Sequence, residues 1–294
     1  MLQVRLLGQL DIRADGQRVV ISSRAGQSLF AYLLLSAGTA HRRERLAGLL
    51  WPDTSDESAR KNLRQELWRI RKAIGSQRPS NGEYIQADEL TVMFNSASKY
   101  WLDVAQLDRP MAADCALDDL VQQVGLYQGE LLPGFYDDWI VLERERIQAA
   151  FETKMGYLLE QLIAAERWLA VQEWGEKWLA YGDAPEPAYR ALMLASGVRG
   201  DMAKVASLYQ RCVDDLREQL GVEPSAETRA LYEGLLKGAQ APARPPTLHS
   251  SGAVTFLFTD IEGSTQLLDR LGESYAAVLT EHHALLRAAI QKWN

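Results

Sequence analysis

The stretch ARKNLRQELWRIRKAIG, residues 59–75, has two opposite faces when it is wound as a helix. At about 100° per residue, its apolar side chains gather within roughly 40° of one direction; they are Ala59, Leu63, Leu67, Ile70 and Ile74. The other face is polar and cationic and consists of Lys61, Gln65, Trp68 and Lys72, flanked by Arg64 and Arg69. Arg and Gln pair with base edges and Lys neutralises phosphate, so this face is a candidate DNA-binding surface. A solvated surface helix with scattered charges is the alternative.

The elements around this stretch form a recognisable order. Alternating apolar residues from Leu2 to Ile12, a turn at Asp15-Gly16 and a further apolar run at 19–21 predict an N-terminal hairpin. Helical spacing then predicts one helix from Ser28 to Gly38, a second that ends at Trp51-Pro52, and a third over 55–74. Residues 84–95 are expected to close the domain as a hairpin around Asp88. The predicted order is strands, three helices and a hairpin.

Two further segments bear on DNA binding. Arg42 and Arg43 precede the second predicted helix, where outward backbone N–H groups also favour phosphate, although a solvated cap explains them equally well. The tip of the closing hairpin is acidic, with Glu83, Asp88 and Glu89. We therefore expect no groove contact from that hairpin.

The distribution of charged residues differs between the first hundred residues and the rest of the chain. The net charge is −7, but residues 1–100 have 15 Lys/Arg against 10 Asp/Glu, whereas residues 101–294 have 17 against 29. A basic N-terminal third on an acidic body is typical of a protein in which one domain meets phosphate, and chance variation in surface charge is the alternative. Two distant cysteines and the absence of a long apolar run predict a cytoplasmic protein without disulfides or membrane spans.

Residues 103–237 show helical periodicity with breaks at glycine and proline, and two helix pairs stand roughly 34 residues apart. This spacing suggests tetratricopeptide-like repeats in which Trp174 and Trp178 match Leu208 and Cys212. The tryptophans at 139, 168, 174 and 178 are interpreted as core rather than as a ligand site. The fold class predicted is mainly α with a small β component.

Several blocks in the first 240 residues resemble the SARP family, whose activators join an OmpR-type winged helix to a bacterial transcriptional activation domain. The matching blocks are VRLLGQLDIRADGQRVVI, RERLAGLLWPD, ARKNLRQELWRIRKAIG, YQGELLPGFYDDWI and LGVEPSAETRALYE. The resemblance implies a winged helix-turn-helix at 1–100 that binds promoter repeats in double-stranded DNA without a cofactor. It also implies a tetratricopeptide-like domain at 101–237 that contacts RNA polymerase or neighbouring subunits, with self-association as a possibility left open.

The remaining residues form a Pro-rich linker at 238–252 and a tail at 253–294. Within the tail, VTFLFTDIEGSTQLLDRLG resembles the start of a class III nucleotide cyclase domain. The resemblance implies that Asp260 and the carbonyl of Ile261 bind a divalent metal, and the turn Gly263, Ser264 and Thr265 suits a nucleoside triphosphate. One carboxylate cannot complete a two-metal site, so the tail is predicted to be inactive and the chain not to be an enzyme. Metal and nucleotide matter only if a complete cyclase domain exists in a longer parent.

Three classes of function therefore stay open at this point. A DNA-binding activator is preferred, because both of its domains are represented in full. The alternatives are the regulatory portion of a cyclase signalling protein and a protein-interaction scaffold built from the helical repeats. Salt-dependent binding to promoter DNA would separate the activator from both alternatives.

Overall fold

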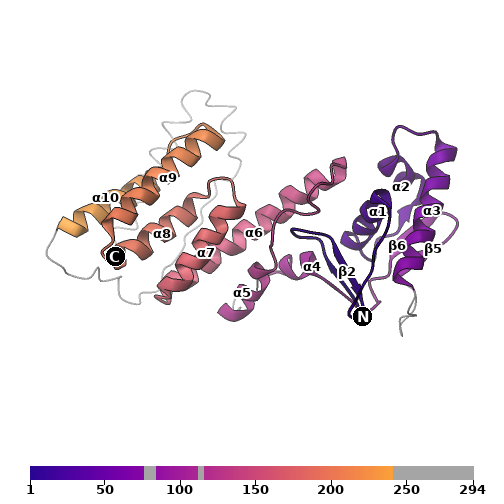
Figure 1. Cartoon of the computed structure of the whole chain (residues 1–294), viewed down its shortest axis with the longest axis horizontal. Coiled ribbons are helices and arrows are strands. Elements are labelled where there is room, and N and C mark those ends of the chain that lie inside the picture. The colour runs from indigo at the N-terminus through magenta and orange to yellow at the C-terminus, as the bar shows by residue number, and fades with distance from the viewer. Residues whose placement is uncertain (76–83, 112–115, 241–294) are drawn as a thin grey trace, which may run out of the picture. The chain divides into compact units, whose positions relative to one another are not determined.

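The computed structural model describes residues 1–75, 84–111 and 116–240, which belong to one compact unit spanning residues 1–243 (Figure 1). The elements up to residue 102 are β1 (Leu2–Arg5), β2 (Asp11–Ala14), β3 (Gln17–Arg18), α1 (Arg24–Leu35), β4 (His41–Arg42), α2 (Arg43–Leu50), α3 (Asp56–Ile74), β5 (Ile85–Ala87), β6 (Thr91–Phe94) and β7 (Tyr100–Leu102). The later helices are α4 (Asp103–Leu107), α5 (Leu117–Gly125), α6 (Asp138–Ala164), α7 (Trp168–Tyr181), α8 (Glu186–Val198), α9 (Met202–Leu220) and α10 (Ala226–Gln240).

The first sheet has the strand order β3-β2-β1-β7. Asp15 and Gly16 join β2 to β3 with φ angles of 47° and 81°, and two positive angles in a two-residue loop are typical of a type I′ hairpin turn. The predicted N-terminal hairpin is therefore confirmed. The prediction that residues 19–21 form a strand is wrong, because β3 ends at Arg18. Only the Val19 N–H continues the pairing, by donating to the Ile12 carbonyl at 2.8 Å.

The second sheet has the order β4-β6-β5, and its β5–β6 hairpin is the wing predicted for residues 84–95. Antiparallel pairing of Ile85 with Phe94 sets its register. His41 of β4 pairs with Val92 of β6, so the short segment before α2 joins the wing as a third strand. The sequence pattern predicted the hairpin but not this third strand.

The three helices α1, α2 and α3 pack against one another, and α1 and α2 also contact the second sheet. α1 begins at Arg24 rather than at Ser28, because the Ser23 side chain caps it and accepts a hydrogen bond from the Gly26 N–H at 3.0 Å. Ser55 caps α3 in the same manner, so the predicted third helix is confirmed to within one residue. The fold class predicted from the sequence, a winged helix followed by helical repeats, is the one observed.

The polypeptide passes from β7 into the helical region through Asp103. Strand β7 pairs in parallel with β1, so the predicted domain limit at residue 100 falls within a strand. The Asp103 side chain is 1% exposed and accepts hydrogen bonds from the Leu6, Leu7 and Val104 N–H groups at 2.8–3.1 Å. Burial raises the pKa of Asp103, against the opposing effect of these N–H groups. This carboxylate ties the end of β1 to the start of α4.

The block YQGELLPGFYDDWI holds the helical region against the N-terminal sheet. Gly8 and Gly129 meet backbone to backbone, since a Cβ built on Gly129 would lie 3.1 Å from the Gly8 Cα. The Leu132 N–H donates to the Leu6 carbonyl at 2.9 Å, and Ser28 Oγ donates to an Asp137 carboxylate oxygen at 3.1 Å. One hydrophobic core consequently runs without interruption from the first strand to the helical repeats.

Helices α7 to α10 lie against one another in sequence order (Figure 1). α7 begins at Trp168 and α9 at Met202, which is the predicted spacing of 34 residues. The matched residues Trp174, Trp178, Leu208 and Cys212 are all buried. The core interpretation also holds for Trp139, whereas Trp168 is only partly buried. The tetratricopeptide-like arrangement is thereby confirmed.

Candidate nucleic-acid interface

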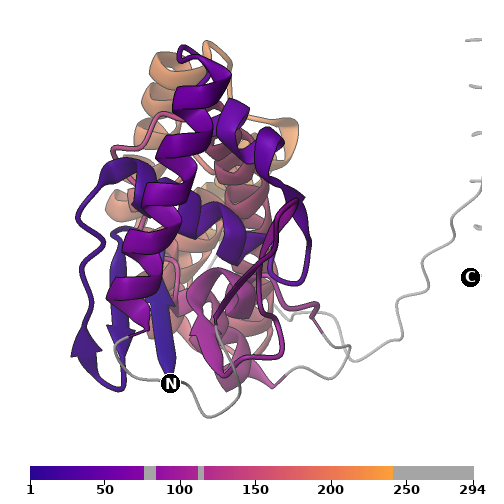
Figure 2. The ribbon, with the colours of Figure 1, turned by 90° about the vertical axis from the view of Figure 1, so that its right-hand side faces the viewer.

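Helix α3 (Asp56–Ile74) lies on the outside of the described unit (Figure 2), and most of its polar side chains are exposed. Its apolar face is buried as predicted, with Ala59, Leu63, Leu67, Ile70 and Ile74 each at most 3% exposed. Of the predicted DNA-binding residues on this helix, five are exposed: Lys61, Arg64, Gln65, Trp68 and Lys72. The sixth, Arg69, is half-buried. A packed inner face and an outward cationic face are what a helix needs to enter a major groove.

Trp68 stands out on this face because 60% of its side chain is exposed. The Lys72 ammonium lies 5.0 Å from the centroid of the indole ring, which is a cation–π distance. This contact orders a lysine that would otherwise sample many rotamers. The pair presents an apolar ring and a positive charge side by side on the surface of α3.

Arg69 and Glu66 form an ion pair one turn apart on α3. The Arg69 Nη1 lies 2.5 Å from a Glu66 carboxylate oxygen, and the Glu66 side chain is almost fully buried. The other carboxylate oxygen of Glu66 accepts a hydrogen bond from the hydroxyl of Ser23 at the N-terminus of α1. The guanidinium of Arg69 is therefore connected through Glu66 to the N-terminus of α1.

The two cations predicted before α2 differ in their surroundings. Arg42 is exposed at the N-cap position of α2, where its side chain makes no capping bond. Arg43 is partly buried and contacts the wing, since its backbone N–H donates to the Leu90 carbonyl at 2.9 Å and its Nη1 to the Asp88 carbonyl at 2.7 Å. Arg43 thus helps to hold the wing beside α2.

The acidic tip of the wing is organised by Asp88. Its carboxylate accepts hydrogen bonds from the Leu90 and Thr91 N–H groups at 2.8 and 2.6 Å and from the Thr91 hydroxyl at 2.9 Å. These hydrogen bonds lower the pKa of Asp88, because they favour the charged form. The Asp88 carboxylate therefore stabilises the turn at the tip of the wing. Leu90 in this turn is 75% exposed.

Two further arginines belong to the α3 surface and were not predicted. Arg60 and Arg71 are both exposed and lie four residues before and seven residues after Arg64, on the same side of the helix. Arg60 pairs with Glu44 at 3.2 Å, and Arg71 donates to the Ile85 carbonyl of the wing at 3.2 Å. The same helical spacing that singled out Arg64 would have found them.

A second basic surface lies on the outer face of the first sheet. Strand register places Arg18, Arg13, Gln3 and Trp101 in one row across β3, β2, β1 and β7. A shallow depression of about 250 Å³ lies there, lined by Gln3, Arg5, Asp11, Arg13 and Trp101. The Arg5 guanidinium is 6.0 Å from the centroid of the Trp101 ring. No sequence pattern within one segment reveals this row, because its members come from four strands.

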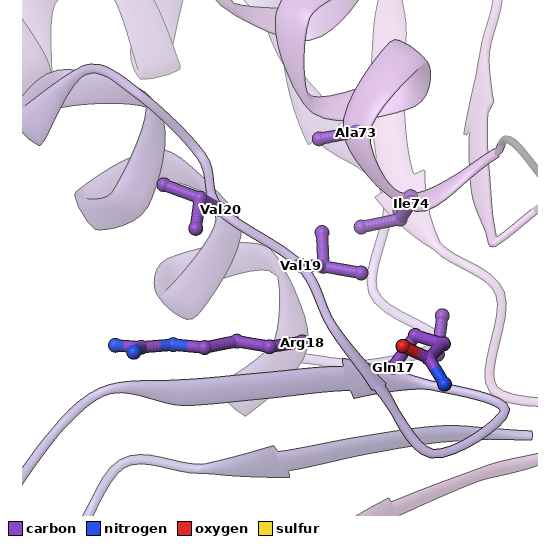
Figure 3. Close-up of a pocket in the computed structure, with 7 residues that line it drawn as sticks. Gln17, Arg18, Val19, Val20, Ala73 and Ile74 are labelled. Atoms are coloured by element: carbon purple, nitrogen blue, oxygen red, sulfur yellow. The ribbon is translucent and has the colours of Figure 1, made fainter.

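Another depression of about 270 Å³ separates β3 and the segment after it from the C-terminal end of α3 (Figure 3). Its lining residues are Ala14, Gln17, Arg18, Val19, Val20, Ala73 and Ile74. Figure 3 shows the Arg18 guanidinium pointing away from Ile74. Because its lining is mainly apolar and its one cation points outward, this depression has no convergent polar groups for a ligand.

The predicted metal and nucleotide residues of the tail, Asp260, Ile261, Gly263, Ser264 and Thr265, lie outside the described residues. Within the described ranges, no group of His, Cys, Asp and Glu side chains is arranged to hold a metal ion. None of the helices in that part of the chain is long and apolar enough to cross a membrane.

Comparison with known proteins identifies the helical region. Residues 103–236 match the family model of the bacterial transcriptional activator domain. The Regulatory protein AfsR of Streptomyces griseus is 27% identical over 252 residues, and the Transcriptional regulatory protein MoaR1 of Mycobacterium tuberculosis is 22% identical over 258 residues. The alignments cover 83% and 80% of this chain. The chain spans about a quarter of the length of AfsR and about four fifths of MoaR1.

A solved structure is similar in fold. It is Mycobacterium tuberculosis EmbR in complex with a low affinity phosphopeptide, with a TM-score of 0.66 and 19% sequence identity. The superposition covers 83% of this chain and 66% of that chain. The matched domain family and the similar sequences are regulatory proteins rather than enzymes. Residues 103–236 therefore form a bacterial transcriptional activator domain that follows a winged helix, and over most of its length the chain is similar to transcriptional regulators of the SARP type.

Proposed function

We propose that this chain is a DNA-binding transcriptional activator that inserts α3 into the major groove of promoter repeats. The observation that supports the proposal is the outward face of α3, where Lys61, Arg64 and Gln65 are exposed while the opposite face is packed into the core. The exposed Gln65 amide can pair with a base edge, and the cations beside it can neutralise phosphate. The residues we place at the DNA are Arg42, Arg43, Lys61, Arg64, Gln65, Trp68, Arg69 and Lys72.

These residues divide into two chemical roles. Arg64, Gln65 and Arg69 have forked or planar polar groups that can pair with base edges. Lys61, Lys72 and Arg42 act as charges toward phosphates, which positions the protein without choosing a sequence. Arg43 acts mainly through the wing, because its two hydrogen bonds to Asp88 and Leu90 fix the distance between wing and α2.

In this proposal residues 101–237 supply activation rather than affinity for DNA. They would contact RNA polymerase or neighbouring subunits, and their acidic surface would add little non-specific binding to a polyanion.

Binding needs no cofactor in this scheme, and the protein acts in the cytoplasm where promoter DNA is found. The division into domains at 1–100, 101–237, 238–252 and 253–294 remains our proposal, as does an inactive cyclase-like tail.

The test is a binding measurement with the 1–294 chain. Duplexes selected by this chain from a random DNA library are titrated by fluorescence anisotropy at several salt concentrations. We expect the combined Lys61→Ala, Arg64→Ala and Gln65→Ala variant to lose about 100-fold or more in affinity for selected sites.

The matched control is Lys99→Ala, which removes an exposed cation of the same domain that is not part of α3. It should bind as the unmodified chain does. Selected sites bound equally well by the triple variant would exclude α3 as the DNA-binding element, provided that circular dichroism shows both variants folded.

A further inference from the structure

Glu66 is an acidic residue in an unexpected place. It lies on α3, whose surface we propose to meet a polyanion, yet it is only 6% exposed. Carboxylates are almost never buried unless they are paired. The partners of Glu66 therefore indicate why an acid is kept at this position.

The carboxylate bridges two helices. One oxygen accepts the hydrogen bond of the Ser23 hydroxyl at the start of α1, and the other lies 2.5 Å from Arg69 Nη1. Gly26 leaves space for the Glu66 carboxylate, since a side chain at this position would clash. A Cβ built on Gly26 would lie 2.6 Å from the Glu66 carboxylate oxygen and 2.7 Å from Ser23 Oγ. Since α1 has no acid in its own first turn, Glu66 supplies a negative charge to the positive N-terminal end of that helix.

The ion pair with Glu66 holds the Arg69 side chain but uses only part of its hydrogen-bonding capacity. About a third of its side chain is exposed. A guanidinium has five N–H donors in a rigid fork, and the Glu66 contact accounts for Nη1 alone. Donors remain for a second, planar partner outside the protein. A guanine offers such a partner through its O6 and N7 acceptors in the major groove.

We infer that Glu66 is a positioning residue that orients Arg69 for bidentate recognition of one guanine in the bound site. This inference rests on the proposed function, because it requires α3 to lie in the major groove. Arginine has many rotamers, so a free side chain would lose entropy on binding. A carboxylate anchored on α1 removes that loss in advance and fixes the direction of the fork. The buried network Ser23–Glu66–Arg69 thus sets one base of the recognised sequence.

The experiment uses the 1–294 chain and duplexes that it has selected from a random library. Each guanine of a selected duplex is replaced in turn by 7-deazaguanine, which lacks the N7 acceptor, and affinity is measured at fixed salt. For the unmodified chain, one guanine should show a loss of about 10-fold on replacement. Arg69→Lys should abolish that loss, because an ammonium cannot form the bidentate pair.

Glu66→Gln is the decisive variant. It keeps the volume of the side chain and the acceptor for Ser23 but removes the charge that holds the guanidinium. We expect the 7-deazaguanine loss at that guanine to fall to about 2-fold or less. Glu57→Gln is the matched control, because it also removes one negative charge from α3 but at an exposed site in its first turn. Both variants should bind random DNA slightly more tightly, and Glu57→Gln should retain the full guanine dependence.

The outcomes distinguish a failure of the proposed function from a failure of the Glu66–Arg69 inference. If the unmodified chain selects no sequence, both the proposed function and this inference are wrong. If it selects sequences but no guanine responds to 7-deaza replacement, or Glu66→Gln leaves the response unchanged, then only the inference is overturned. Should Glu66→Gln fail to fold by circular dichroism, Glu66→Asp replaces it, since a shorter carboxylate keeps the charge and withdraws it from Arg69.

Discussion

Helices α3 and α9 have the same length and the same general design, but their outer faces differ. Each has 19 residues, a side chain that caps its N-terminus and a buried apolar stripe. α3 has six Lys/Arg against three Asp/Glu, whereas α9 has three of each. On α9, Arg211 lies 3.5–3.6 Å from Asp215 and Glu176, and Arg217 lies 2.9 Å from Glu223. Its arginines are neutralised within the protein.

On α3, by contrast, Lys61 and Arg64 form no ion pair within the part of the chain that the structure describes. Amphipathic design by itself therefore does not distinguish a DNA-binding helix from a packing helix. The two helices differ in that Lys61 and Arg64 of α3 have no carboxylate partner among the described residues, whereas Arg211 and Arg217 of α9 both have one. Phosphate can replace bulk counterions around an unpaired cation, which is the basis of salt-dependent DNA binding.

The largest effect that we expect concerns Asp103, which links the N-terminal sheet to the helical region. Asp103→Ala removes an acceptor for three backbone N–H groups, those of Leu6, Leu7 and Val104. Leaving buried N–H groups without a partner should lower the free energy of unfolding by about 2–4 kcal/mol. Chemical denaturation monitored by circular dichroism measures the change.

Asp108→Ala is the control, since it removes a half-exposed carboxylate that pairs with Arg146. A surface pair of that kind should cost about 0–1 kcal/mol. Equal losses for the two variants would mean that the Asp103 hydrogen bonds do not join the two regions.

The next effect compares the two helices directly. Arg64→Ala on α3 should weaken binding to a selected duplex by about 1–3 kcal/mol, because one base contact is lost. Arg211→Ala on α9 should leave binding unchanged, since its charge is already paired with Glu176 and Asp215. Anisotropy titrations of both variants at one salt concentration provide the measurement. A loss of the same size for Arg211→Ala would abolish the distinction between the helices.

A smaller effect separates phosphate contacts from base contacts on α3. Lys72→Ala should weaken selected and random duplexes to the same degree, because an ammonium near phosphate does not discriminate sequence. The slope of log affinity against log salt concentration should decrease in magnitude by about 0.9. An unchanged slope would show that Lys72 serves only to cover the Trp68 ring.

The smallest effect concerns pH. His41 is buried, and burial first and Arg45 second lower its pKa from 6.5. Its contribution to stability is therefore present above pH 6.5 and is lost as the pH falls through the lowered value. We expect the N-terminal region to lose stability between pH 7.5 and 5, and His41→Gln to reduce that loss. The described helical region has no histidine, so it should change less. Thermal melts at the two pH values would contradict this if the variant and the parent responded alike.

Much of the architecture follows from local patterns. Helical spacing over 59–75 predicted both faces of α3. The 34-residue offset predicted that Trp174 and Trp178 occupy positions equivalent to Leu208 and Cys212, and all four are buried. Such features depend on periods of 2 and 3.6 residues, which any single segment displays. The start of α1 was misplaced because its first turn has little apolar periodicity, and the Ser23 cap defines it instead.

The sequence by itself determined which side chains of α3 face outward and that an acidic helical region follows a basic one. Only the tertiary structure decided which of those side chains are held in place. Glu66 joins Arg69 to Ser23, Asp103 joins β1 to α4, and the row from Arg18 to Trp101 crosses four strands. The long-range contacts among them, Ser23–Glu66, Leu6–Asp103 and Gln3–Trp101, link residues 43, 97 and 98 positions apart. They depend on packing and strand register rather than on any local period.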